Sequence, residues 1–355
     1  MNTKFISIPA TPDGARRAAD GGDIPLVVVS RHGLGDNVFF SPCFEPLSTR
    51  WPCVYFTSAV NAYTTIFHES NLARALYAGS VNGAKLGLST PEVFAAHFER
   101  LQLDLGSAAA FVYHFGLFDP KLSYRHESAF VKGRRNQVEL FGDGPGACQT
   151  PRYHVAPDSA SRAYVGAQLD RWLPGRELIC IARYGHTGPG KNFGNSYQET
   201  LEVIRLLNAR HPERFRFLSL DYVPGVHAAD GRETNVRSLY GFLPCDAASL
   251  HHLLCRARVL VTVPSGPMLI GATIPRLKMI TLWKTMKPFH YLDPQFDSSN
   301  PVRALVARTD LSDTSFMNGW PPASRDAVLS RWRLRVGQID AGSVSDEVSA
   351  TVEEV

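Results

Sequence analysis

The stretch VVVSRHGLGD, residues 27 to 36, joins an apolar run to a short loop that contains two glycines. The valines at 27 to 29 are β-branched and uninterrupted by polar residues, which favours a strand covered on both faces. The glycines permit a tight turn, and the apolar spacing of the following DNVFFSPCFEPL favours a helix that Pro42 and Pro46 weaken. We therefore expect a strand, a loop and a helix, with Asp36 where the helix begins.

Asp36 has two interpretations. An aspartate at a helix start commonly caps the helix, because its carboxylate accepts hydrogen bonds from free backbone amides. Alternatively, the crevice between the strand and the helix presents Asp36 to a ligand. The local sequence leaves both open.

Strand-like and helix-like stretches alternate along the chain, which indicates βαβ units and parallel sheets. In the first half we expect strands over 26–30, 53–58 and 108–116, and helices over 36–48, 59–72, 91–103 and 122–138. In the second half we expect strands over 177–185, 215–222, 259–264 and 277–283, and helices over 196–211, 246–257 and 265–274.

A chain of 355 residues exceeds the size, about 250 to 300 residues, at which one core usually stops growing, so we expect two domains. The acidic end of the chain is poor in large apolar residues, and we expect it to be mobile. The expected divisions are a flexible N-terminal arm (1–24), an N-terminal Rossmann-like domain (25–150), a linker (151–176), a C-terminal Rossmann-like domain (177–320), a C-terminal helix (321–340) and a mobile tail (341–355).

The composition is that of a soluble globular protein, with 44% hydrophobic and 20% charged residues and a net charge of +4. The sequence contains no basic tract of the kind that binds nucleic acid. It also contains no apolar span of 18 residues, which argues against a membrane crossing. The N-terminus lacks the features of a signal peptide, and no cysteine belongs to a CxxC pair, so we expect a cytoplasmic protein with free thiols. The cysteines are at 43, 53, 148, 180, 245 and 255.

His251, His252 and Cys255 are the nearest approach to a metal-binding cluster. Adjacent histidines on a helix point about 100° apart, and no second pair of ligands has metal spacing. We therefore expect no metal site.

Three segments carry residues suited to ligand chemistry. They are RHGLGD (31–36), the Gly-rich ARYGHTGPGKNFGNS (182–196) and VTVPSGPMLIGA (261–272). Free amides at 265 to 268 and the ammonium of Lys191 would both attract a diphosphate, although Lys191 would equally suit a solvated surface and Ser265 a helix cap. Neither a P-loop nor a complete GxGxxG fingerprint is present.

These segments resemble glycosyltransferase family 9, the heptosyltransferases of lipopolysaccharide core synthesis. GLGDNVFFSP looks like the G-x-GD-x-x-x-x-x-P opening of that family, and LHHLLCRARVLVTVPSGPMLIGATIPRLKMITLW is similar to its donor-site segment with the SGPMH-type turn. GPGKNFGNSYQETLEVIRLL resembles the K-x-W-P stretch that opens the second domain. The matches occur in the family's order, so the resemblance implies the GT-B fold, in which two Rossmann-like α/β domains face each other across a cleft.

The resemblance also implies roles for individual residues. Asp36 falls on the catalytic aspartate and Lys191 on the phosphate-binding lysine. The donor-phosphate turn falls on Ser265, Gly266, Pro267 and Met268. The sequence departs from the family at Val263 and Pro264 (usually an Asp nearby), at Leu269 (a His) and at Phe193 (a Trp), which implies a donor other than ADP-heptose.

The function that follows is an inverting transfer of a sugar from a nucleotide diphosphate to a hydroxyl acceptor such as a bacterial glycan, with no cofactor and no essential metal ion. The N-terminal domain would hold the acceptor and the C-terminal domain the donor, and membrane contact would arise only through the acceptor. Further cleft candidates are Arg31, His32, Gly33, Gly35, Arg183 and His186. Acceptor candidates are Tyr124, Arg125, Arg134 and Arg135, although a basic run of this kind also suits a solvated helix face.

Two other classes remain open. A non-catalytic protein that binds nucleotide sugars or glycans would retain the fold and tolerate the missing Asp and His. A nicotinamide-dependent oxidoreductase would share the α/β pattern, but it requires a fuller GxGxxG and an acidic residue about 20 positions later.

Overall fold

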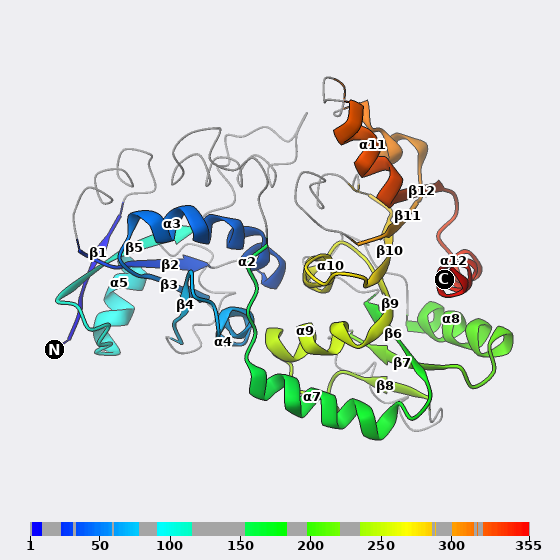
Figure 1. The fold of residues 1–355 in the computed structure, drawn as a ribbon, viewed down its shortest axis with the longest axis horizontal. Helices are drawn as coiled ribbons and strands as arrows, with labels where there is room; N and C mark the ends of the chain where they lie inside the picture. Colours follow the sequence, from blue (N-terminus) through cyan, green and yellow to red (C-terminus); the bar gives the residue numbers. More distant parts are fainter. Residues whose placement is uncertain are drawn as a thin grey trace. The chain divides into compact units, whose positions relative to one another are not determined.

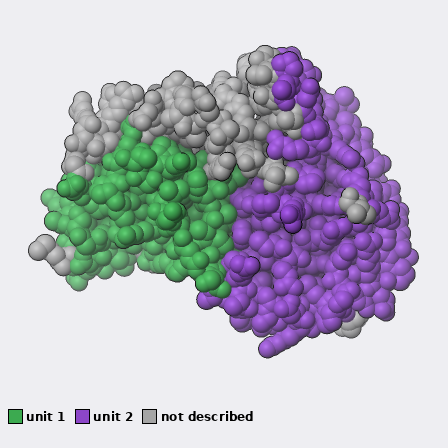
Figure 2. All heavy atoms as spheres, in the orientation of Figure 1, with its two compact units in different colours: residues 1–159, 246–248, 295–297 green, residues 160–245, 249–294, 298–355 purple. Residues whose placement is uncertain are grey.

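The structure, a computed structural model, divides into two compact units, which Figure 2 distinguishes by colour. Unit 1 comprises Met1–Ser159, Asp246–Ala248 and Gln295–Asp297, and unit 2 comprises Ala160–Cys245, Ser249–Pro294 and Ser298–Val355. The residues that the structure describes are 2–8, 23–30, 33–58, 60–77, 91–115, 153–182, 197–220, 235–285, 288, 300–315, 318 and 322–354. The expected helix over 122–138 lies outside them.

Unit 1 is built on a parallel sheet with the strand order β1-β5-β2-β3-β4 (Figure 1). Its central strand, β2 (Leu26–Ser30), is buried at every residue, as the valine run predicts. Ser30, the last residue of β2, aligns with Ser58 of β3, so both lie at the carboxyl edge of the sheet. The other strands are β1 (Lys4–Ser7), β3 (Val54–Ser58), β4 (Arg74–Ala75) and β5 (Ala109–Phe115).

Helices cover both faces of this sheet. On one face, α5 (Pro91–Arg100) packs against β1 and β5, with Phe94 and Phe98 in a core that includes Val27 and Val29. The opposite face carries Phe56, whose ring contacts aromatic rings of the helices that follow β2, with centroids 5.4 to 6.0 Å apart. Those helices are α2 (Leu34–Phe40), η1 (Ser41–Cys43) and α3 (Phe44–Arg50), and after β3 come α4 (Asn61–Thr64) and η2 (Thr65–Phe67).

The expected single helix over 36–48 is therefore wrong in detail. Pro42 lacks an amide proton, so the α-helical hydrogen-bond ladder is interrupted and the chain passes through the 3₁₀ turn η1. The Ser41 hydroxyl donates to the Val38 carbonyl across 2.7 Å at this break.

Unit 2 is built on a longer parallel sheet with the strand order β12-β11-β10-β9-β6-β7-β8 (Figure 1). The strands β6 and β10 are buried at every residue after the first, and β9 is buried over its last four residues, which agrees with their apolar runs. The bounds are β6 (Glu177–Ala182), β7 (Phe215–Ser219), β8 (Val236–Ser238), β9 (Ala257–Thr262), β10 (Lys278–Trp283), β11 (Val302–Val306) and β12 (Trp332–Val336).

Two helices cover one face of the unit 2 sheet. α8 (Tyr197–Arg210) and α12 (Ala341–Glu353) contact each other, and both contribute to the core that contains Ile179, Ile181, Val259 and Val261. Figure 1 shows α9 (Ala247–Cys255) and α10 (Gly266–Ala272) on the other side of the sheet. The remaining helices are α7 (Ser159–Trp172), η5 (Thr309–Ser312) and α11 (Pro322–Arg331).

Gly271 sets how closely α10 approaches the sheet. A Cβ atom at this position would lie 2.8 Å from Leu260 Cδ2 and 3.0 Å from Met279 Sδ, so only glycine fits without displacing the core. Asn300 holds the end of the same helix, because its Nδ2 donates to the Gly271 carbonyl across 2.8 Å and to the Ile274 carbonyl across 2.5 Å. The close packing at Gly271 and the hydrogen bonds from Asn300 together hold α10 against the sheet, with its first residue just beyond the carboxyl end of β9.

The sequence predicts a flexible arm over 1–24, but residues Lys4–Ser7 form β1 and pair with β5. Phe5 is buried against Phe98, with ring centroids 5.1 Å apart. The Thr3 hydroxyl donates to the Ser107 carbonyl across 2.8 Å. Apolar burial and this hydrogen bond hold the strand on the sheet.

The mobile tail expected over 341–355 is also wrong, because residues 341 to 353 form α12. Val344, Val348 and Val352 recur at helical spacing and are buried in the unit 2 core. Arg303 pairs with Glu347, and the Lys278 ammonium donates to the Thr351 carbonyl across 2.8 Å. Small apolar residues at regular spacing and these polar contacts therefore dock the helix together.

Two further divisions need correction. The linker expected over 151–176 contains α7, whose Val165, Leu169 and Trp172 are buried. The C-terminal helix expected over 321–340 ends at Arg331, and Trp332–Val336 form the strand β12 beside β11. The alternation in WRLRV suits a strand, which the helical interpretation overlooked.

Candidate active site

Asp36 lies in the first turn of α2, just beyond the carboxyl edge of β2. It is the third residue of the helix rather than its cap, since Gly33 occupies the N-cap position with an extended backbone. The amides of Asp36 and Asn37 donate to the Gly33 carbonyl across 3.1 and 3.3 Å. The Asp36 carboxylate accepts from the Gly33 amide across 2.9 Å. The simple N-cap interpretation is therefore incorrect.

Two influences act in opposite directions on the ionisation of Asp36. Burial disfavours the charged carboxylate and raises its pKa from 3.8 to about 7, while the hydrogen bond from the Gly33 amide partly opposes that rise. An acid with a pKa near the working pH can accept and return a proton. Asp36 can therefore exchange a proton near neutral pH, and it lies at the sheet edge where α/β folds bind ligands.

In unit 2 the segment after β9 passes from a strand end into the helix α10, as the sequence predicts. Ser265 is the N-cap residue of α10 and has an extended backbone, but its side chain makes no capping hydrogen bond to the helix. The Ser265 hydroxyl instead donates to the Val263 carbonyl across 2.9 Å. Because the Ser265 side chain makes no capping hydrogen bond, its hydroxyl does not accept from the first backbone N–H groups of α10.

The start of the second Gly-rich segment lies beside this turn. The Val263 amide donates to the carbonyl of Ala182, the last residue of β6, across 3.0 Å. The carboxyl end of β6 at Ala182 therefore lies next to the residues that lead into Ser265.

The rest of the SGPML sequence is mostly inside the protein. Pro267, Met268 and Leu269 are buried, whereas Ser265 and Gly266 are partly exposed. Leu269, the position at which the resembled family has a histidine, has an exposed fraction of 0%. The side chains of Met268 and Leu269 consequently serve packing, and only the start of the turn is open to a ligand.

Several expected site residues lie outside the described residues, and the structure does not test them. They are Arg31, His32, Tyr124, Arg125, Arg134, Arg135, Arg183, His186 and Lys191. Gly33 is exposed and is the N-cap of α2, while Gly35 is buried in its first turn.

Asn37, next to Asp36, is a polar residue that the sequence reasoning missed. Its side chain is fully buried, and neither Oδ1 nor Nδ2 has a hydrogen-bond partner in the part of the chain that the structure describes. The sequence does carry a signal for it. Asn37 lies three residues before Phe40, so it is a polar residue at a position where the helical pattern expects an apolar one.

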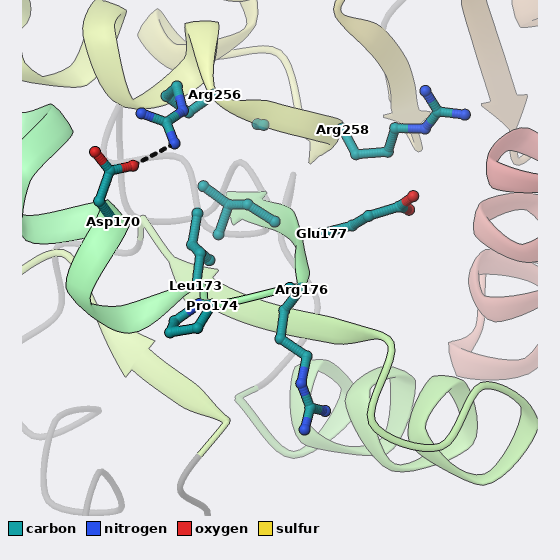
Figure 3. Close-up of a pocket in the computed structure, with 10 residues that line it drawn as sticks. Asp170, Leu173, Pro174, Arg176, Glu177, Arg256 and Arg258 are labelled. Atoms are coloured by element: carbon teal, nitrogen blue, oxygen red, sulfur yellow. Dashed lines mark hydrogen bonds and ion pairs between the residues drawn. The ribbon is translucent and has the colours of Figure 1, made fainter.

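A cavity of about 500 Å³ opens in unit 2 at the amino ends of β6 and β9. Arg256 pairs with Asp170 across 2.6 Å, and Figure 3 shows Arg176 and Arg258 pointing in different directions from it. The three guanidinium groups do not converge on one point. The cavity is also at the opposite sheet edge from Ser265, so it is separate from the candidate phosphate turn.

No group of three or more metal-ligating side chains in the described ranges is placed to hold a metal ion. In the cluster considered above, Cys255 Sγ lies 3.7 Å from His251 Nδ1, and burial lowers the pKa of His251 to about 4. No described helix is long and apolar enough to cross a membrane.

Known structures share this architecture. A family 9 glycosyltransferase from Veillonella parvula DSM 2008 superposes with a TM-score of 0.56 at 15% identity, covering 94% of this chain and 98% of that one. E. coli ADP-heptose lipopolysaccharide heptosyltransferase II superposes with a TM-score of 0.54 at 15% identity, covering 87% of this chain and 99% of that one. No protein-family model and no curated protein sequence matches the chain.

The chain therefore has the fold of the family 9 glycosyltransferases, with two Rossmann-like α/β units of parallel sheet. The GT-B fold class that the sequence motifs implied is confirmed. At 15% identity the likeness establishes the fold, and the chemistry has to be argued from the residues.

Proposed function

We propose that this protein is an inverting glycosyltransferase that moves a sugar from a nucleotide diphosphate to a hydroxyl acceptor. The observation that carries the proposal is Asp36, a carboxyl group with a pKa near 7 at the carboxyl edge of a parallel sheet. The shared fold and the order of the three sequence motifs support the same conclusion.

Asp36 acts as the general base in this proposal. It removes the proton from the acceptor hydroxyl while the hydroxyl oxygen forms a bond to the anomeric carbon. The bond from that carbon to the diphosphate oxygen breaks on the opposite face, so the configuration inverts. The departing diphosphate carries away the bonding electrons as negative charge.

The donor diphosphate is held by Lys191 and by the turn at Ser265, Gly266, Pro267 and Met268. The backbone N–H groups of the turn, to which Pro267 contributes none, and an ammonium group stabilise the developing charge, which is the role a divalent ion has in other transferases. The reaction therefore needs no metal ion. Among the turn residues, partial exposure of Ser265 and Gly266 supports contact through their backbone.

The acceptor is a bacterial glycan, such as a lipopolysaccharide core, and the reaction takes place in the cytoplasm. Tyr124, Arg125, Arg134 and Arg135 are the proposed contacts for its acidic or phosphorylated groups. Arg31, His32, Arg183 and His186 are weaker candidates for substrate contact. Any membrane contact arises through the acceptor.

A second function is a non-catalytic protein that binds a nucleotide sugar. The wholly buried Leu269 favours it, because the histidine of the resembled family has no polar substitute there. The same observation supports a donor other than ADP-heptose if the protein is an enzyme.

The test is a side-by-side titration and transfer assay with ADP-, GDP-, UDP- and dTDP-sugars, with and without EDTA. The transferase proposal expects one donor other than ADP-heptose to raise the unfolding temperature and to be consumed at equal rates with and without EDTA. Binding without transfer to any glycan acceptor would favour the non-catalytic function. Clear preference for ADP-heptose would contradict the donor assignment, and loss of transfer in EDTA would contradict metal independence.

A further inference from the structure

Asn37 is a buried polar side chain that makes no hydrogen bond to the part of the chain that the structure describes. Its exposed fraction is 0%, yet both polar atoms of its amide lack a partner among the described residues. Buried amides in proteins are almost always hydrogen-bonded, because an unpaired one has lost water and gained nothing in return. Local rules broken in this way concentrate at functional sites.

The position of Asn37 on α2 sets which side of the sheet it occupies. Phe40, one turn further along α2, stacks on Phe56 of β3 with ring centroids 6.0 Å apart. Side chains three residues apart on a helix share a face, so Asn37 lies on the Phe56 side of the sheet. Because α2 begins beyond the carboxyl edge, Asn37 is nearer to that edge than Phe40.

Other polar residues gather on the same side of the sheet edge. Side chains two residues apart on a strand share a face, so Ser58 points to the same side as Phe56, as does Ser30, which aligns with Ser58. Both serines are buried. α4 contacts α2 and begins at Asn61, whose Oδ1 is buried and also lacks a partner in the described chain. We call Ser30, Asn37, Ser58 and Asn61 the polar floor.

The polar floor consists of neutral groups. Amides and hydroxyls can each donate and accept, which matches the O–H groups of a saccharide. These four side chains would give a phosphate no positive charge in exchange for its lost water, and the neighbouring Asp36 carboxylate would repel it. The chemistry therefore favours a neutral hydroxyl ligand over an anion.

We propose that Asn37, together with Asn61, binds a non-reacting hydroxyl of the acceptor saccharide and thereby determines acceptor specificity. The inference rests on the proposed function, because it places the acceptor beside Asp36. It adds a neutral hydroxyl contact to the charged contacts proposed for the acceptor.

Access to Asn37 requires a local change, because neither polar atom of its amide is exposed to solvent. Asn61 is only partly buried and provides the approach. The first turn of α2 closes on Gly33 through the hydrogen bonds described above, and the proposal requires that this turn shift when the saccharide binds.

The first measurement is the unfolding temperature of Asn37→Leu without ligand. Leucine resembles asparagine in shape and removes the unpaired polar atoms, so we expect the variant to be at least as stable as the wild type. Ser41→Ala is the contrasting control. The Ser41 hydroxyl donates to Val38 and accepts from the His154 amide across 3.0 Å, so its removal should lower stability. A clear loss of stability in both Asn37→Leu and the smaller Asn37→Ala would show that the amide is already paired, which overturns the proposal.

The second measurement is the binding of methyl hexosides and methyl heptosides, each compared with its mono-deoxy analogues. The wild type should discriminate against the analogue lacking one particular hydroxyl by about 10-fold or more, and Asn37→Leu should lose that discrimination. Thr57→Val is the matched control. Thr57 is also buried, and its hydroxyl has no partner among the described residues, but it aligns with Val29 and so faces the α5 side of the sheet. Its variant should discriminate like the wild type.

Equal discrimination by the wild type and Asn37→Leu would overturn the proposal, as would a wild-type protein that binds none of the glycosides. Neither result bears on nucleotide-sugar binding. Failure of this contact can therefore be distinguished from failure of the proposed function.

Discussion

The Asp36 carboxylate and the Gly33 amide form a hydrogen bond across 2.9 Å at the start of α2. The bond stabilises the ionised carboxylate, yet burial has the larger effect and raises the pKa to about 7. The free protein therefore contains a carboxyl group that ionises near neutral pH at an edge of the sheet suited to ligands. This relationship leads to predictions about both stability and catalysis.

Asp36→Asn should change how stability depends on pH. The unfolded-state pKa is near 3.8 and the folded one about 7, so between these values the folded protein binds more protons than the unfolded chain. The free energy of unfolding should therefore fall as pH rises from about 4 to about 7. Because asparagine stays neutral, the variant should match the wild type near pH 4 and exceed it above pH 7 by about 1 to 2 kcal/mol, a value reduced for the partial exposure of the side chain. Denaturant unfolding at pH 4 and pH 8 measures this, and a wild type that gains stability between them relative to the variant would contradict the raised pKa.

Lys191→Ala should weaken the binding of nucleoside diphosphates more than the binding of the matching nucleosides, because the ammonium attracts the phosphate charge. We expect about a 10-fold or greater loss for ADP, GDP or UDP, whichever the wild type binds, and little change for its nucleoside. Lys4→Ala serves as control, since Lys4 is an exposed residue of β1 in unit 1. Equal losses for the nucleotide and the nucleoside would place Lys191 away from the phosphates.

Leu269→His should destabilise unit 2 rather than restore the histidine of the resembled family. Leu269 is wholly buried, so an imidazole there would lose water in an apolar environment. We expect a loss of about 1 to 3 kcal/mol in the free energy of unfolding, without a new preference for ADP-heptose. A stable variant that gains affinity for ADP-heptose would show that position 269 reaches the donor.

Val348→Ala should lower the stability of unit 2 by about 2 kcal/mol, because Val348 is buried in the core between α12 and the sheet. The control is Asp346→Ala on the same helix. Asp346 forms an exposed ion pair with Arg210 across 2.6 Å, and such pairs contribute less than about 1 kcal/mol. Equal unfolding midpoints for Val348→Ala and the wild type would mean that α12 is not docked.

The elements that the sequence predicts well are those whose own residues carry the signal. The valines of β2 and the run LICIA of β6 are apolar enough to indicate buried strands on their own. β1 and α12 were missed because their stability comes from partners far away in the chain. Phe5 needs Phe98, and Glu347 needs Arg303, so no local pattern reveals either contact.

In the candidate site, too, some features are marked by the local sequence and others depend on the folded chain. Asp36 and Ser265 could be found because glycines and strand ends mark their positions. The pKa of Asp36 could not be predicted, since it depends on how the folded chain buries the carboxylate. The role of Ser265 was ambiguous for a similar reason, because only the structure shows its hydroxyl bonded to Val263 instead of the helix. Asn37 stands out only when its polar side chain is compared with its burial, and the burial is known only from the structure.

The most direct test of the proposed function is the rate of sugar transfer by Asp36→Asn, measured beside the binding of the nucleotide-sugar donor. Asparagine keeps an oxygen that can accept from the Gly33 amide but cannot take a proton from the acceptor. We predict donor affinity within about 2-fold of the wild type and a transfer rate at pH 8 lower by about 100-fold or more. Transfer by the variant at the wild-type rate would contradict the account, because Asp36 would then serve only the first turn of α2.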